Sequence, residues 1–104
     1  MKLNTEKINS LVKSIESDNS QLMKYLKSRY PLFHNSNFFL KDFQYGIKRF
    51  LESKNIEVNE VEAQQLTASI SHSFETHGIF IKTNSLGWKI NYPDFVTTTP
   101  GDPL

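Results

Sequence analysis

Apolar positions recur at helical spacing in two neighbouring segments near the start of the chain. Residues 4 to 16 carry apolar side chains three and four positions apart, the pattern of an amphipathic helix: Ile8, Leu11, Val12 and Ile15. The run Ser17-Asp18-Asn19-Ser20 interrupts this pattern with residues that favour helix N-caps. The pattern resumes from 19 to 29, either as a second helix or as a continuation of the first. Pro31 ends this second helix, because proline pushes the residue before it out of the α region.

Two more helices are predicted in the middle of the chain. The third is capped by Ser36 or Asn37 and has a strongly aromatic apolar side: Leu40, Phe43, Ile47, Phe50 and Leu51. Gly46 lies inside it, where glycine costs about 1 kcal/mol relative to alanine, so we expect it to mark a close helix crossing. The fourth helix begins at Asn59, which is spaced from Glu62 for a capping box, and ends at His77-Gly78.

A β-hairpin is predicted for residues 79–82 and 88–92, joined by a loop at 84–87. Placing Thr83 opposite Trp88 gathers five apolar side chains on one face: Ile79, Ile81, Trp88, Ile90 and Tyr92.

The same register sets Lys82 opposite Lys89 on the outer face of the hairpin. Like charges placed directly opposite are unfavourable, so something should compensate them. We expect the compensating group to be Glu57 or a phosphate backbone. The first requires the short β-type fragment 56–58 to join the hairpin as a third strand.

The element order predicts an α+β fold, a small helical domain of three to four helices followed by a C-terminal β-hairpin. One domain over residues 1–92 accounts for these elements, and the Pro- and Thr-rich segment 93–104 is predicted as an extended tail that Phe95 holds against the body. From 56 to 91 the order of short strand, helix and hairpin resembles the C-terminal part of a winged-helix domain. That resemblance implies a winged-helix-like architecture. It departs from the pattern at 59–77, which holds one helix where two and a turn are usual.

Composition narrows the classes of protein. The 104 residues carry 12 Lys or Arg against 11 Asp or Glu. The resulting net charge of +1 does not predict binding to nucleic acid or to an acidic membrane. The absence of cysteine excludes disulfides and thiolate metal sites and is typical of the cytoplasm, where we expect the protein. No apolar run approaches the roughly 20 residues that span a membrane, and the first residues predict no secretory signal.

Short motifs of catalytic chemistry are present but lie in the wrong context. Ser10-Leu11-Val12-Lys13 and Ser17-Asp18-Asn19 match the motifs of serine–lysine enzymes, yet they fall within ten residues of each other. His72 and His77 are five positions apart and do not share a helical face as a metal pair would. We therefore expect no enzyme, no catalytic or metal-binding residue, no cofactor and no small-molecule substrate.

Charged and aromatic residues supply the candidate binding sites. The candidate contacts to an anion or nucleic acid are Lys82, Lys89, Lys24, Lys27 and Arg29. The candidate partner surface consists of aromatic residues outside the main apolar stripes: Phe38, Phe39, Tyr45 and Phe80. Residues 59 to 77 carry three acids and no Lys or Arg, which argues against DNA reading by the fourth helix.

Our first hypothesis is therefore a non-enzymatic binding module that acts through protein contacts, as a subunit, adaptor, inhibitor or homodimer. The alternative is a winged-helix-like regulatory protein that binds nucleic acid.

Overall fold

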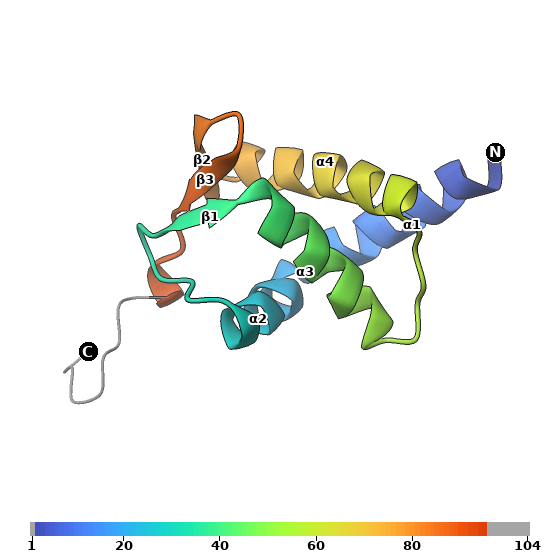
Figure 1. Ribbon diagram of the computed structural model, residues 1–104, viewed down its shortest axis with the longest axis horizontal. Coiled ribbons are helices and arrows are strands. Elements are labelled where there is room, and N and C mark those ends of the chain that lie inside the picture. The colour runs from blue at the N-terminus through green and yellow to red at the C-terminus, as the bar shows by residue number, and fades with distance from the viewer. Residues whose placement is uncertain (1, 96–104) are drawn as a thin grey trace.

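Helices make up most of the molecule, and a small sheet lies at one end of them (Figure 1). The computed structural model describes residues 2–95. Within these residues the elements follow in this order: α1 (Lys2–Ser17), α2 (Asn19–Arg29), β1 (Asn37–Phe39), α3 (Leu40–Glu52), α4 (Glu60–Thr76), β2 (Phe80–Asn84), β3 (Gly87–Ile90) and the short 3-10 turn η1 (Pro93–Phe95). The predicted α+β fold, mainly helical with a C-terminal hairpin, is confirmed.

The chain turns a corner at Asp18, between α1 and α2. Ser20 Oγ donates a 2.6 Å hydrogen bond to Asp18 Oδ1, and Gln21 Nε2 donates one of 3.2 Å to Oδ2. The Ser20 bond is the main reason that the pKa of the Asp18 carboxyl lies below its ordinary value. The predicted interruption at 17–20 therefore separates two helices with different neighbours, since α1 packs against α4 and α2 packs against α3 (Figure 1).

Gly46 lies where α3 crosses α2. A Cβ at this position would collide with the side chain of Leu26 and would lie 3.5 Å from Tyr30 Cε2. Leu26 is fully buried, so it has little room to move aside. The prediction that this glycine marks a helix crossing is confirmed.

Both predicted ends of α4 are confirmed. At its start, Glu62 N donates to Asn59 Oδ1 (2.8 Å) and Asn59 N donates to Glu62 Oε1 (2.9 Å), which completes the capping box. Lys7 Nζ of α1 donates to the same Oε1 at 3.3 Å. These contacts, the backbone bond from Asn59 first, hold the pKa of Glu62 below its usual range. At the other end Gly78 adopts φ +76°, the left-handed conformation expected beyond a helix C-terminus.

The third strand of the sheet comes from a part of the chain for which no strand was predicted. Asn37–Phe39 forms β1 and pairs with β3, giving the order β1-β3-β2. The predicted helix cap at Ser36 or Asn37 and the predicted strand at 56–58 are both wrong. Residues 56–58 instead connect α3 to α4, where they bury Val58 in the core without strand pairing. As a result, two helices lie between the first strand and the hairpin.

The hairpin pairs one residue out of the predicted register. Ile81 faces Lys89 and Lys82 faces Trp88, so the predicted pairing of Thr83 with Trp88 is wrong. A bulge between Lys82 and Asn84 absorbs the extra residue, and the turn contains two residues, not four.

In the observed register Phe80 is buried in the core, and Ile81 is not. The Phe80 ring centroid lies 4.9 Å from that of Phe43, 5.1 Å from that of Phe74 and 4.7 Å from that of Trp88. Ile81 points outward and is 47% exposed. Burying the larger aromatic ring removes more apolar surface from water, which is the physical reason for the shift.

Phe95 is buried against the body, as predicted, and its carbonyl oxygen accepts a hydrogen bond from the His34 backbone N–H. Residues 96–104 of the predicted tail lie outside the described residues. None of the helices in residues 2–95 combines the length and hydropathy that crossing a membrane requires.

Candidate interaction surfaces

The outer face of the sheet displays large apolar side chains. Asn37 and Ile81 both pair with Lys89, so these three residues share one face, and Phe39, two positions from Asn37, lies on it too. Phe39 is 54% exposed and Ile81 is 47% exposed. At the adjoining hairpin tip Leu86 is 66% exposed. We call Phe39, Ile81 and Leu86 the outer apolar surface.

Gly87 allows β1 to approach the hairpin closely enough to build this surface. A Cβ at Gly87 would lie 2.5 Å from the carbonyl oxygen of Phe38 and 3.3 Å from Phe39 Cδ1. The ring of Phe39 therefore lies over the glycine. Leu40 N donates a 2.8 Å hydrogen bond to the Leu86 carbonyl, and Leu86 N donates one to Asn84 Oδ1. These bonds fix the tip of the hairpin against the start of α3.

The predicted aromatic surface divides into buried and exposed members. Phe38 and Phe80 are each 2% exposed and belong to the core, so the prediction that they lie on a partner surface is wrong. The reason is strand alternation: β1 reads exposed, buried, exposed, which turns Phe38 inward and Phe39 outward. Tyr45 is 55% exposed but lies on α3, on a different element from Phe39.

The predicted pair of Lys82 and Lys89 does not form. Both side chains are exposed, but Lys82 is opposite Trp88 and Lys89 is opposite Ile81, so the two lysines point to opposite faces of the hairpin. Glu57 lies in the connection between α3 and α4, where its carbonyl accepts a 2.8 Å bond from Lys7 Nζ. The predicted compensation of the lysines by Glu57 is therefore wrong as well.

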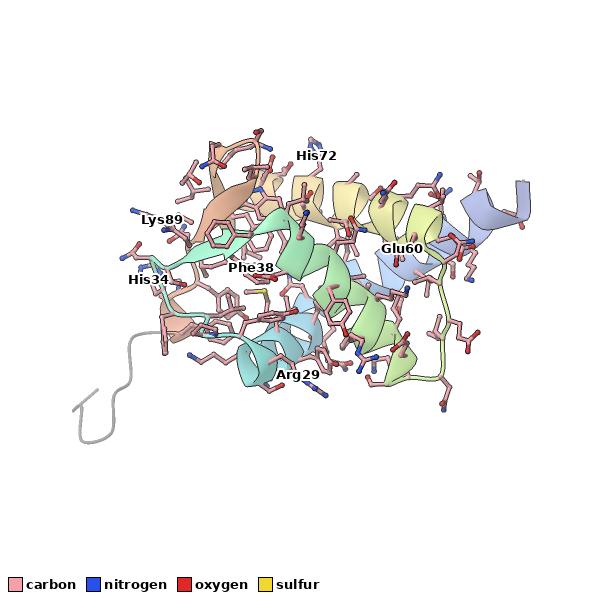
Figure 2. All side chains as sticks on the ribbon, in the orientation of Figure 1. Arg29, His34, Phe38, Glu60, His72 and Lys89 are labelled. Carbon is pink, nitrogen blue, oxygen red and sulfur yellow. The ribbon has the colours of Figure 1, made fainter. Side chains whose placement is uncertain are left out.

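The predicted cations of α2 have local partners or stand apart from the hairpin. Lys27 Nζ donates a 2.6 Å bond to the Leu32 carbonyl and lies 3.7 Å from the centre of the Phe33 ring, and burial lowers its pKa. Lys24 is exposed on the same helix. Figure 2 shows Arg29, the last residue of α2, well away from Lys89 on the sheet, with the label of the core residue Phe38 between them in this view. The structure thus does not gather these cations into one cluster.

The three histidines are separate from one another. His34 Nδ1 accepts a 3.1 Å hydrogen bond from Tyr92 N, His77 Nδ1 lies 2.8 Å from the Ser73 carbonyl, and His72 is exposed on α4. Among the described residues no group of three or more His, Cys, Asp or Glu side chains is arranged to hold a metal ion.

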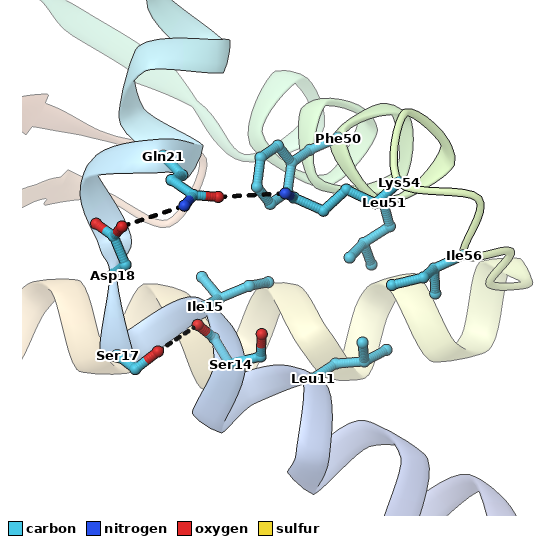
Figure 3. A pocket seen from close by; sticks show the side chains of 10 residues that line it. All are labelled: Leu11, Ser14, Ile15, Ser17, Asp18, Gln21, Phe50, Leu51, Lys54 and Ile56. Carbon is cyan, nitrogen blue, oxygen red and sulfur yellow. Dashed lines mark hydrogen bonds between the residues drawn. The ribbon is translucent and has the colours of Figure 1, made fainter.

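A cavity of about 210 Å³ lies at the corner of α1 and α2, beside the end of α3 (Figure 3). Lys54 Nζ donates to Gln21 Oε1 at 3.2 Å, and Gln21 donates in turn to Asp18. Ser17 Oγ donates to the Ser14 carbonyl. Because these polar groups already bond to one another or to the backbone, we interpret this cavity as a structural cleft.

A second, smaller cavity lies between α2 and α3 and has free hydrogen-bond donors. We call it the Tyr–Arg pocket, and its volume is about 110 Å³. It is lined by Tyr25, Arg29, Tyr30, Tyr45, Gly46 and Arg49. Of these residues, Arg29 and Tyr45 are predicted from the sequence as members of two different sites. The signal was present, because Tyr25 precedes Arg29 by four positions and Tyr45 precedes Arg49 by four.

Comparisons of the chain with protein-family models, with curated proteins and with solved structures found no match. Its function must therefore be inferred from the geometry and chemistry of these surfaces.

Proposed function

We propose that this protein is a non-enzymatic binding module that contacts a protein partner through the outer face of its sheet. The outer apolar surface carries this proposal, since Phe39, Ile81 and Leu86 are all about half or more exposed. Among the paired residues of that face in the described strands, Lys89 alone carries a charge. Aromatic residues and a depletion of charge are typical of the centre of a protein interface.

The size of the surface favours a transient partner over a permanent dimer. Three large side chains exposed to this degree offer roughly 300 Å² of apolar area, a size at which patches on monomers are often functional. A stable dimer buries roughly 800 Å² on each partner. The partner we propose has an apolar contact surface and an acidic side chain opposite Lys89. The cytoplasm is the compartment we propose, on the absence of cysteine.

Site-specific photocrosslinking tests this proposal. A benzophenone amino acid replaces Phe39, and crosslinked products in a cell extract are compared for the otherwise unchanged chain and for chains that also carry Ile81→Ser or Leu86→Ser. We expect one discrete product that both serine variants lose. Val61→Ser is the matched control, because Val61 is equally apolar and 60% exposed but lies on α4.

Two results would contradict the proposal. One is a product that survives both Ile81→Ser and Leu86→Ser, and the other is a product lost equally in the Val61→Ser control. Sedimentation of the purified protein adds an independent measurement, and we expect a monomer at micromolar concentration.

Binding of nucleic acid is the second candidate, and the order of elements favours it. The sequence β1, α3, α4, β2, β3 with strand order β1-β3-β2 resembles a winged-helix domain more fully than residues 56–91 alone did. With β1 as the first strand, two helices, α3 and α4, lie between the strand and the wing, where residues 56–91 hold only one. In this arrangement α4 would enter the groove and the β2–β3 hairpin would be the wing.

The surface chemistry of α4 ranks this candidate second. Its exposed residues beyond Glu60 lack Lys, Arg, Asp and Glu: Val61, Gln64, Gln65, Ala68, Ser69, His72 and Thr76. Gln, Ser and His can contact bases, but cations on phosphates supply most of the affinity. Titration of labelled duplex at low salt, with a Lys82→Glu, Lys89→Glu double variant beside the natural chain, tests this candidate. Sub-micromolar binding that the variant loses would rank it first.

A further inference from the structure

The crossing of α2 and α3 brings two matching pairs of side chains to one cavity. Arg29 Cζ lies 5.1 Å from the centre of the Tyr25 ring, and Arg49 Cζ lies 5.5 Å from the centre of the Tyr45 ring. Both pairs have the spacing of four that places side chains next to each other on a helix. Gly46 makes this arrangement possible, because its missing side chain lets the two helices approach each other.

The Tyr–Arg pocket is strongly enriched in arginine and tyrosine compared with the rest of the chain. The chain has two arginines and four tyrosines, and both arginines and three of the tyrosines line this one cavity. A guanidinium that stacks on an aromatic ring keeps its planar edge of N–H donors available for an oxyanion. Two such groups from different helices can therefore approach one anion from different directions.

The donors of the pocket are mostly unused. Within residues 2–95 no hydrogen-bond partner is present for the side-chain hydroxyls of Tyr25, Tyr30 and Tyr45, or for the guanidinium of Arg29. Arg49 Nη1 bonds to Glu52 Oε1 at 3.0 Å, in a pair whose side chains are 50% and 39% exposed. Exposed pairs of this kind are weak, so a dianion can compete with Glu52 for Arg49.

Two further groups define the charge of the pocket. Burial, then the carboxylate of Asp42 and the neighbouring phenols, raise the pKa of Tyr30 above its usual value, against the opposing charge of Arg29. Tyr30 therefore remains a protonated donor at neutral pH. The negative charge of Asp42, near Tyr30, also offsets part of the positive charge of the two arginines.

We propose that the Tyr–Arg pocket binds the phosphoryl group of a phosphate monoester. Arg29 and Arg49 donate to its oxygens from two sides, and the hydroxyls of Tyr25, Tyr30 and Tyr45 donate to those that remain. A phosphate monoester offers three acceptor oxygens and a charge of about −1.5 to −2 at pH 7, which matches a set of donors spread in three dimensions. A carboxylate offers two oxygens in one plane and would leave donors unused.

The volume of the pocket limits what else can enter. Pockets for drug-sized ligands measure roughly 300–1,000 Å³. At about 110 Å³ the Tyr–Arg pocket accommodates a phosphoryl group but not a whole nucleotide. The rest of the ligand therefore remains outside the pocket, whose lining residue Tyr45 is 55% exposed. This proposal is independent of the outer apolar surface, which lies on other elements.

Titration of the full chain in phosphate-free buffer at constant ionic strength tests the proposal, with binding followed by calorimetry and by amide chemical shifts. The probes are inorganic phosphate, phosphoserine, phosphotyrosine and, as an anion without phosphorus, acetate. We expect the three phosphate compounds to bind and to shift amides around Arg29 and Arg49, and acetate to bind at least tenfold more weakly. Phosphopeptides that bind more tightly than free phosphoserine would identify a modified protein side chain as the source of the group, and equal affinities would identify a small phosphorylated molecule.

Matched variants locate the binding. Arg29→Gln and Arg49→Gln should each weaken phosphate binding about tenfold or more, since each removes a charged donor. Tyr45→Phe keeps the ring and should weaken it about threefold to tenfold. Lys24→Gln removes an exposed cation of α2 that does not line the pocket and should leave binding unchanged. Thermal melting of each variant shows that it is folded.

Three results would overturn the proposal: no binding of any phosphate compound by the natural chain, equal losses in Lys24→Gln and the arginine variants, or binding of a single-stranded oligonucleotide at these residues without binding of any phosphate monoester.

Discussion

The indole Nε1 of Trp88 donates a 2.6 Å hydrogen bond to Glu75 Oε2 and so joins the central strand of the sheet to the last turn of α4. Trp88 is 3% exposed, and its ring also packs against Phe43 and Phe80. The bond satisfies a donor that the sheet would otherwise bury.

Replacing Glu75 should therefore loosen the contact between the hairpin and α4. We expect Glu75→Ala to lower the free energy of unfolding by about 1–3 kcal/mol, because the buried indole N–H loses its partner. Glu75→Gln keeps an acceptor oxygen and should cost less. Urea denaturation followed by the fluorescence of Trp88, the only tryptophan, measures both. Equal stability of the two variants and the natural chain would show that the bond contributes nothing.

Gly46→Ala tests the helix crossing. The added methyl group would collide with the buried side chain of Leu26, and we expect a loss of about 1–3 kcal/mol in the free energy of unfolding. The double variant with Leu26→Val should recover part of this loss. In an open helix the same substitution would stabilise by up to about 1 kcal/mol, so a higher melting temperature for Gly46→Ala would contradict the crossing.

Phe80 and Ile81 test the register of the hairpin. Phe80→Ala should cost about 3–5 kcal/mol because it empties a core site, and Phe80→Leu serves as a milder variant if the first does not fold. Ile81→Ala should change stability by no more than about 0.5 kcal/mol. Thermal melting ranks the three. The register predicted from sequence requires the opposite order, with Ile81 the costlier substitution.

Glu62 should make the stability of the fold sensitive to acid. Its pKa is lowered in the folded state, so it contributes stability that is fully present above the ordinary value of 4.5 and is lost as the pH falls through the folded pKa. Glu62→Gln can still accept from the Asn59 backbone but loses the charge that Lys7 contacts. We expect this variant to melt below the natural chain at pH 7 and the difference to shrink towards pH 3. A difference independent of pH would show that the charge has no role.

Local signals were sufficient to predict the four helices and most of their ends, but not the start of α3. The bounds of α2, the capping box at Asn59, the left-handed turn at Gly78 and the crossing at Gly46 all follow from interactions within a few residues or from the requirements of one residue type. Such features leave the same trace in any fold that contains them, which is why the sequence reveals them.

The sheet depended on information that a periodic pattern does not contain. Residues 56–58 and Asn37–Phe39 are both short and apolar enough for a strand, and only the position of α3 decides which of them reaches β3. The register failed for a related reason: a bulge at Thr83 reverses the face of every residue before it, and alternation alone cannot show a bulge.

In the candidate sites, too, local features were predicted correctly and features that depend on long-range pairing were not. Phe39 and Tyr45 were predicted to be exposed and are, but Phe38 and Phe80 were placed on the surface because the strand and register were wrong. The Tyr–Arg pocket needs two helices at a particular crossing. Each Tyr–Arg pair is visible in the sequence, and their meeting is not.

The strand order also has a consequence for biosynthesis. β3 is the central strand of the sheet and the last of the three to be synthesised, so β1 has no strand partner while the ribosome is making α3, α4 and β2. Asn37 and Lys89 are then 52 positions apart (89 − 37), and closing such a long loop is slow compared with forming local helices. In the nascent chain, Phe39 and Ile81 therefore come to lie on a common surface only after β3 has paired with both other strands. A partner that binds this surface can recognise only a chain in which β3 has already joined the sheet.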